Sequence, residues 1–217
     1  WELKGAYDLV TEADRASEKL VVERLNSYFP THSVLGEEGG LRESSGEYIW
    51  YVDPLDGTTN FAHGYPAFNV TMGLEHAGEM IAGVIFDPIH QEMFAAELGG
   101  GAFLNGRRIH ASKQTKLETA LLATGFPSRK RHDNVNVHFY HQAAMVTHGV
   151  RRSGSAAIDL SCVACGRLEG FWEFGLSPWD MAAGLLLVRE AGGRTSDMKG
   201  APANVRGPNV VTTNGLI

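Results

Sequence analysis

The run from residue 50 to residue 60, Trp-Tyr-Val-Asp-Pro-Leu-Asp-Gly-Thr-Thr-Asn, constrains the fold of this chain more than any other segment. Its first three residues predict a short buried strand, and Gly57 with the two threonines after it predicts the start of a helix. Asp53 and Asp56 lie between these elements, and Pro54 fixes the backbone that joins them.

This run favours a particular chemistry. Two carboxylates on a rigid turn hold hard divalent cations through oxygen. Free N–H groups at a helix start can take phosphate oxygens. Metal and phosphate held together indicate phosphoryl chemistry. The same residues are also typical of a plain turn with a helix cap, so the run alone leaves both interpretations open.

Two further acidic segments carry the residue types that such a site needs. Glu37 and Glu38 follow a short strand predicted at residues 33–35, and glycines flank them. They form either a solvated loop or a metal-ligating Glu37 with Glu38 supporting it. Asp180 falls in the first turn of a helix that has Ser177 as N-cap and Pro178 as first residue. It either stabilises that helix start or ligates metal.

The rest of the pattern predicts a mixture of helices and strands. We expect a helix over residues 11–28, with Thr11 as its cap and Ala13, Ala16, Leu20 and Leu25 on its apolar face. Strands are predicted at 68–74, 80–86, 91–97 and 121–124, with a hairpin turn at 77–79, turns over 99–106 and a helix over 134–146. A boundary near residues 112–121 divides the chain into halves. These patterns alone support only a mixed α and β protein.

Charge and hydropathy exclude some classes of protein. A net charge of −6 argues against a surface that coats nucleic acid. No apolar run approaches the ~20 residues of a membrane span, and no signal peptide is visible at Trp1. We therefore expect a cytoplasmic protein with no membrane partner and no nucleic-acid partner.

Two smaller features each have a plain interpretation. Cys162 and Cys165 have the spacing of a redox or zinc pair, but no second pair or nearby histidine completes a zinc site. We expect buried thiols in a tightly packed helix and no disulfide. The basic loop at residues 128–134, with Arg129, Lys130, Arg131 and His132, is either a solvated loop or a contact for a partner.

The acidic motifs together resemble the inositol monophosphatase family, which are metal-dependent, lithium-sensitive sugar phosphatases. The motifs are Gly36-Glu37-Glu38, residues 53–58 and Trp179-Asp180. The resemblance extends over essentially the whole chain through residues 8–14, 154–157, Glu173 and 190–193, and residues 151–156 and 171–173 are most similar to the bacterial branch. Members of the family usually carry a further N-terminal helix and a longer C-terminal tail, and we expect this chain to lack both.

The resemblance implies an α+β fold, a layered α/β/α/β/α sandwich of the sugar phosphatase type. An antiparallel sheet flanked by helices would precede a smaller second half, with the active site between them. Residues 1–115 would carry most metal ligands, and residues 116–217 would carry Asp180 and the substrate-recognition residues. The implied ligands of two or three Mg²⁺ are Glu37, Asp53, the Leu55 carbonyl, Asp56 and Asp180. Mn²⁺ would be a possible substitute, and Li⁺ would inhibit.

The resemblance also implies the roles of individual residues. Glu37 would orient or deprotonate the attacking water, and Thr58 with Asp14 would form a proton relay. Substrate contacts would come from Asp56, Gly57, Thr58, Gly154, Ser155, Ala156, Glu173 and Asp180. Inositol 1-phosphate is the leading substrate, because Glu173 stands where this family recognises the inositol ring.

Other functions stay open within this resemblance. Related branches hydrolyse fructose 1,6-bisphosphate, histidinol phosphate or 3′-phosphonucleotides with the same metal core. A different kind of function is regulatory, because some bacterial relatives are implicated in binding transcription machinery, and the basic loop would be the contact. The family usually forms homodimers, so we expect one here.

Overall fold

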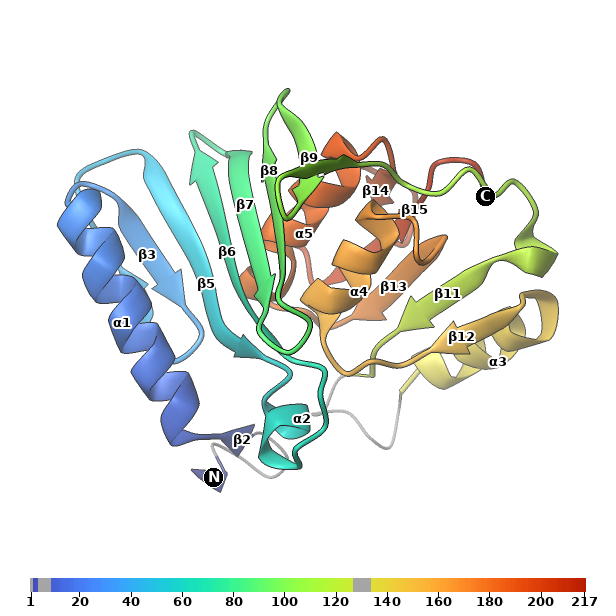
Figure 1. The fold of residues 1–217 in the computed structure, drawn as a ribbon, viewed down its shortest axis with the longest axis horizontal. Helices are drawn as coiled ribbons and strands as arrows, with labels where there is room; N and C mark the ends of the chain where they lie inside the picture. The colour runs from blue at the N-terminus through green and yellow to red at the C-terminus, as the bar shows by residue number, and fades with distance from the viewer. Residues whose placement is uncertain (1, 4–8, 127–133) are drawn as a thin grey trace.

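The computed structural model describes residues 2–3, 9–126 and 134–217. Two large sheets dominate this part of the chain (Figure 1). The first has the strand order β10-β9-β8-β7-β6-β5-β3-β4 and the second β12-β11-β13-β15-β14. The strands of the first sheet are β3 (Ser33–Gly36), β4 (Gly40–Arg42), β5 (Tyr48–Asp56), β6 (Asn69–His76), β7 (Glu79–Asp87), β8 (Glu92–Glu97), β9 (Gly101–Leu104) and β10 (Arg107–Ile109). Those of the second are β11 (Leu121–Thr124), β12 (Gly149–Arg151), β13 (Gly170–Phe174), β14 (Arg194–Ser196) and β15 (Asn209–Thr213), and β1 (Glu2–Leu3) pairs with β2 (Leu9–Val10).

Helices separate and flank the two sheets, which gives the layered α+β fold that the family resemblance implies (Figure 1). Helix α1 (Glu12–Tyr28) packs on β5 at the outer side of the first sheet, and α3 (Asn136–Val146) packs on β12. Helices α4 (Ala156–Ala164) and α5 (Pro178–Glu190) lie between the sheets and contact both. The short α2 (Thr58–Ala62) follows β5, and a 3₁₀ turn covers Leu117–Thr119.

The main hydrophobic core runs through this central helical layer. Every residue of α5 from Met181 to Val188 is buried, as expected of a helix covered on both sides. Leu160 of α4 and Ile85 of β7 are fully buried in the same cluster. Because α5 is held so firmly between the sheets, its first turn, with Asp180, has a fixed position.

Most predicted elements are confirmed to within two residues, but residues 102–106 are not all turn. They form β9 and the start of a hairpin to β10, and only Asn105 and Gly106 make the turn, with φ of 48° and 76°. Two consecutive positive φ values suit the right-handed twist of the strands. The first sheet is also not wholly antiparallel, because β3 and β5 run parallel.

The prediction of which α1 residues face the core is wrong. Leu20 is 57% exposed and Ala16 is exposed, whereas Asp14 and Glu18 are buried with Val22 and Leu25. The helix therefore turns two carboxylates inward at its N-terminal end. Hydrogen bonds to both of them, described below, offset the cost of burial. None of the described helices is long and apolar enough to cross a membrane.

Candidate active site

The end of β5 forms the predicted kink. The pairing of β5 with β6 shifts register between Asp53 and Asp56, where Pro54 has no N–H to donate. Asp53 Oδ1 accepts the Leu55 N–H at 2.9 Å, which fixes the turn. The chain then passes through Gly57, at φ 95°, into α2. A side chain there would collide with the backbone, since a Cβ would lie 2.8 Å from the Ala67 carbonyl oxygen.

Four acidic side chains from three segments of the chain converge at this kink. Asp53 is 2% exposed, and its burial raises the pKa of its carboxyl well above the usual range. The negative charges of Glu37, Asp56 and Asp180 raise that pKa further. The cluster combines the loop after β3, the end of β5 and the first turn of α5. Buried carboxylates this close together repel one another when ionised, and a bound cation would relieve that repulsion.

Asp56 is held by donors from both halves of the chain. Its Oδ2 accepts hydrogen bonds from Ser155 Oγ at 2.6 Å, the Ala157 N–H at 2.8 Å and Asn69 Nδ2 at 3.1 Å. Burial raises the pKa of Asp56, and these hydrogen bonds oppose that rise. Ser155 also caps α4 by accepting the Ile158 N–H. The start of α4 is thereby attached to the end of β5.

Thr58 and Asp14 are in hydrogen-bonding contact. Thr58 Oγ1 lies 3.0 Å from Asp14 Oδ1 and 3.0 Å from the Leu55 carbonyl oxygen. The other Asp14 oxygen accepts the Thr11 N–H at 2.7 Å and the Thr11 hydroxyl at 2.6 Å. With the bond from the Asp14 N–H to Thr11 Oγ1, the bond from the Thr11 N–H makes a capping box at the predicted cap of α1. They also hold the Asp14 carboxylate in place for Thr58.

Glu173, at the end of β13, lies beside the same cluster. Its carboxyl packs against Gly125 so closely that a Cβ on Gly125 would overlap it. Burial raises the pKa of Glu173, and the charges of Asp180, Asp159 and Asp56 raise it further. Asp159 itself has a pKa raised to about 8, chiefly by burial. The predicted substrate-recognition face is therefore rich in buried carboxyl groups.

The loop before α4 lies against α2. Gly154 has φ 89°, and a Cβ there would come 2.9 Å from Asn60 Nδ2. That amide donates to the Ser153 carbonyl oxygen at 2.9 Å and to the Ala67 carbonyl oxygen at 2.7 Å. Gly154, Ser155 and Ala156 are thus brought next to Gly57 and Thr58. Asp180 keeps its capping role as well, because it accepts the Ser177 N–H at 2.7 Å.

The donor set fits Mg²⁺. Carboxylate and carbonyl oxygens are hard ligands that suit Mg²⁺, whereas zinc and copper sites favour nitrogen and sulfur. Asn69 Oδ1 is a buried acceptor with no partner among the described residues, which is typical of the surroundings of a hydrated site. Within residues 2–3, 9–126 and 134–217, however, no three His, Cys, Asp or Glu side chains are already arranged to hold an ion.

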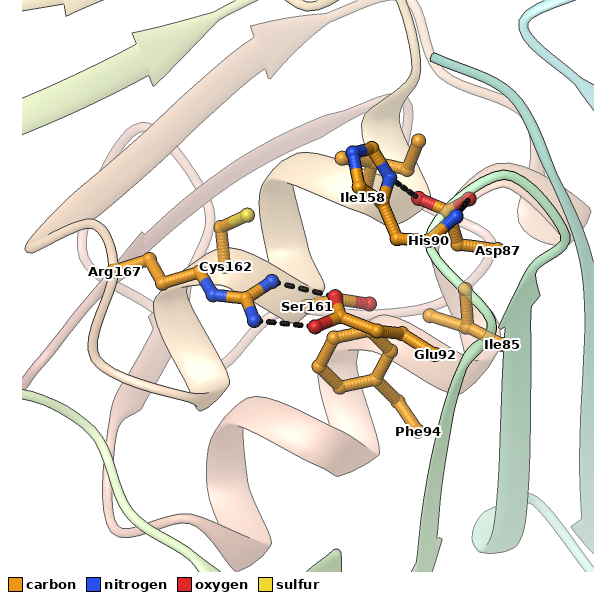
Figure 2. Close-up of a pocket in the computed structure, with 9 residues that line it drawn as sticks. All are labelled: Ile85, Asp87, His90, Glu92, Phe94, Ile158, Ser161, Cys162 and Arg167. Carbon is orange, nitrogen blue, oxygen red and sulfur yellow. Dashed lines mark hydrogen bonds and ion pairs between the residues drawn. The ribbon is translucent and has the colours of Figure 1, made fainter. Parts of the chain in front are cut away.

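A cavity of about 340 Å³ lies elsewhere, between β7, β8 and α4 (Figure 2). Four of its polar side chains form two pairs: Asp87 Oδ2 lies 2.8 Å from His90 Nδ1, and Arg167 donates to both carboxylate oxygens of Glu92. None of the predicted site residues lines it. Cys162 lines this cavity, and burial raises its pKa to about 12. Cys162 and Cys165 are free thiols, as expected, but only half-buried.

Three residues at the site were not found from the sequence. Asn69 and Asp159 approach Asp56 only after distant segments pack together. Glu18 lies one helical turn after Asp14, and this four-residue spacing was the available signal that both face inward. The basic loop with Arg129, Lys130, Arg131 and His132, predicted as a solvated loop or a contact for a partner, lies outside the described residues, as does Asp8.

Comparison with known proteins gives a consistent picture. The model of the inositol monophosphatase family matches residues 2–217. Nus factor SuhB of Pseudomonas aeruginosa is 49% identical over 217 residues, which cover 97% of this chain and 80% of that protein. The inositol-1-monophosphatase of Rhizobium meliloti is 46% identical, over 98% of this chain and 80% of that protein. The solved inositol monophosphatase structure from Anabaena (Nostoc) superposes with a TM-score of 0.92 at 47% identity, over 96% of this chain and 83% of that one. The chain belongs to the inositol monophosphatase family.

Proposed function

We propose that this protein is a Mg²⁺-dependent phosphomonoesterase that hydrolyses inositol 1-phosphate, or a related sugar phosphate, to the free alcohol and phosphate. The convergence of Glu37, Asp56 and Asp180 on the buried Asp53, beside the α2 start, carries this proposal. Membership of the family supports phosphatase activity. The name of the Rhizobium meliloti relative, inositol-1-monophosphatase, supports the choice of substrate.

Glu37, Asp53, the Leu55 carbonyl, Asp56 and Asp180 would hold two or three Mg²⁺, for which Mn²⁺ could substitute. Bound Mg²⁺ would neutralise this cluster and the substrate phosphate, and would lower the pKa of the attacking water. Li⁺ would inhibit. The repulsion that raises the pKa of Asp53 supports this assignment, because cation binding would relieve it.

The residues of the chain would handle the proton and the phosphate. Glu37 would orient or deprotonate the attacking water. The Thr58 hydroxyl would assist, because Asp14 Oδ1 lies 3.0 Å away and can accept its proton. The N–H groups of Gly57 and Thr58 would hold phosphoryl oxygens as negative charge develops.

The substrate alcohol would be recognised by its hydroxyl groups. Glu173, Asp56, Asp180 and the backbone of residues 154–156 would face the sugar or inositol ring. Buried acceptors of this kind discriminate against an alcohol that lacks the matching hydroxyls, because they would lose their partners. A polyol phosphate such as inositol 1-phosphate therefore fits better than a simple alkyl phosphate.

The test is phosphate release from inositol 1-phosphate, fructose 1,6-bisphosphate, histidinol phosphate and adenosine 3′,5′-bisphosphate. Each substrate is offered with Mg²⁺, with chelator, and with Mg²⁺ plus Li⁺. We expect Mg²⁺-dependent release, fastest from inositol 1-phosphate and slowed by Li⁺. A dominant rate on another substrate would assign another branch of the family. No release from any substrate by folded, Mg²⁺-supplied protein would refute the proposal.

A second candidate function is regulatory binding to the transcription machinery. The Pseudomonas aeruginosa relative supports it, because that protein is named a Nus factor. The basic loop with Arg129, Lys130 and Arg131 would make the contact. Affinity capture from lysate, with and without neutralisation of these three charges, is the test. Loss of a partner with phosphatase activity intact favours this function, and identical captured proteins count against it.

We also propose that the protein acts in the cytoplasm as a homodimer. Analytical ultracentrifugation tests the assembly directly. A single species with the mass of one chain, across the micromolar range, would exclude the dimer.

A further inference from the structure

Glu18 is a buried carboxylate whose role the proposed mechanism leaves open. It lies on α1 one turn after Asp14 and is 4% exposed. A carboxylate in such a position is costly unless it accepts hydrogen bonds or contacts a cation. Its surroundings therefore indicate what it is for.

The Glu18 carboxylate fills the inside of the loop after β3. Its Oε2 accepts the Glu38 N–H at 2.8 Å. A Cβ on Gly36 would lie 2.6 Å from that same oxygen, and a Cβ on Gly39 would lie 2.6 Å from Oε1. The two glycines of the Gly-Glu-Glu-Gly motif thus leave room for the Glu18 carboxylate that a side chain at either position would take. The loop folds around this carboxylate.

The same loop presents Glu37 to the acidic cluster. The Glu37 N–H donates to the Val52 carbonyl oxygen at 3.2 Å, and Val52 directly precedes Asp53 on β5. The backbone around Glu37 is therefore tied to β5 at one residue and to α1 at the next. Figure 1 shows α1 lying beside β3 and β5, so the helix can brace the loop against the sheet.

We propose that Glu18 is a positioning residue that holds the residue 36–39 loop in the conformation in which Glu37 can ligate Mg²⁺. This inference rests on the proposed function of Glu37. A purely structural Glu18 would contribute to stability without affecting metal affinity. A positioning Glu18 must affect the affinity of the folded protein for Mg²⁺.

The test compares Glu18→Ala and Glu18→Gln with wild type by isothermal titration of Mg²⁺ into the folded protein without substrate. Loss of a residue that orients a metal ligand typically lowers metal affinity about 10- to 100-fold, and we expect this of Glu18→Ala. Glu18→Gln should restore most of the affinity, because its amide oxygen can still accept the Glu38 N–H. Glu23→Gln is the matched control, since Glu23 lies on the same helix, is exposed and pairs only loosely with Lys19 at 4.0 Å.

Wild-type Mg²⁺ affinity in folded Glu18→Ala would overturn the proposal. If that variant does not fold, Gly39→Ala replaces it, because its Cβ would press on Glu18 Oε1 from the loop side without a left-handed backbone. A similar loss of affinity supports the proposal, and unchanged affinity overturns it. If wild type binds Mg²⁺ but releases no phosphate, the proposed function fails while the comparison of affinities still decides the role of Glu18.

Discussion

Replacing Asp53 with asparagine should stabilise the metal-free protein at neutral pH. Asp53 is 2% exposed, and the charges of Glu37, Asp56 and Asp180 surround it. Asparagine keeps the oxygen that accepts the Leu55 N–H but carries no charge. The variant therefore removes the repulsion between Asp53 and its three acidic neighbours and leaves the turn intact.

The size of this effect depends on pH, because the folded-state pKa of Asp53 is raised above its unfolded value. Below about pH 4 the carboxyl is protonated in both states, and the two proteins should differ little. Above that pH the unfolded chain loses the proton more readily than the folded protein, so wild type loses stability as pH rises. The loss is up to about 1.4 kcal/mol per pH unit until the folded carboxyl ionises.

Urea denaturation in excess chelator, at several pH values from 4.5 to 7.5, measures this difference. We expect Asp53→Asn to become steadily more stable than wild type across the range. Glu79→Gln, which neutralises an exposed carboxylate, is the control, and its unfolding free energy should match that of wild type at every pH. If the difference in unfolding free energy between Asp53→Asn and wild type does not change with pH, the reasoning is refuted.

Three further predictions concern metal, packing and catalysis. Mg²⁺ at 100 times its dissociation constant should stabilise the folded protein by about 2.7 kcal/mol. In a chain of this size, that stabilisation raises Tm by roughly 5–10 °C. Equal melting temperatures in chelator and in Mg²⁺ would contradict a metal site. Arg206→Met should lower the unfolding free energy by about 2–4 kcal/mol in urea titration, because it leaves the buried charge of Glu75 without its cation. Glu75 is 3% exposed and accepts hydrogen bonds from both terminal guanidinium nitrogens of Arg206 and from the Tyr51 hydroxyl. The double variant Arg206→Met with Glu75→Leu should recover most of the lost unfolding free energy. No recovery would mean that Arg206 does not stabilise the fold through its ion pair with Glu75. Thr58→Val should lower kcat at least about 100-fold with little change in Mg²⁺ affinity, because it removes the hydroxyl beside Asp14; an unchanged kcat would exclude the relay.

Local chemistry made part of this fold predictable. The strand, kink and helix around Asp53 follow from proline, glycine and short-range hydrogen bonds. The capping boxes at Thr11 and Ser177 likewise involve residues only three apart. Such elements need no knowledge of the rest of the chain, which is why the sequence indicated them correctly.

Contacts between distant segments were not predictable in the same way. Asn69 reaches Ser155 across 86 residues, and nothing near either residue indicates the partner. The face of α1 was wrongly predicted because apolar periodicity favours burying Leu20. The structure instead buries Glu18, whose hydrogen bond comes from Glu38, 20 residues away. A hydrogen bond from a distant segment therefore accompanies a buried face that apolar periodicity does not predict.

The most direct test of the central claim is Mg²⁺-dependent phosphate release from inositol 1-phosphate by wild type and Asp180→Asn. Asparagine can still accept the Ser177 N–H that caps α5, so the helix start should survive. The account predicts Mg²⁺-dependent turnover by wild type, and a loss of at least about 100-fold in the folded variant. Turnover at the wild-type rate by Asp180→Asn would contradict it, because Asp180 would then be only a helix cap.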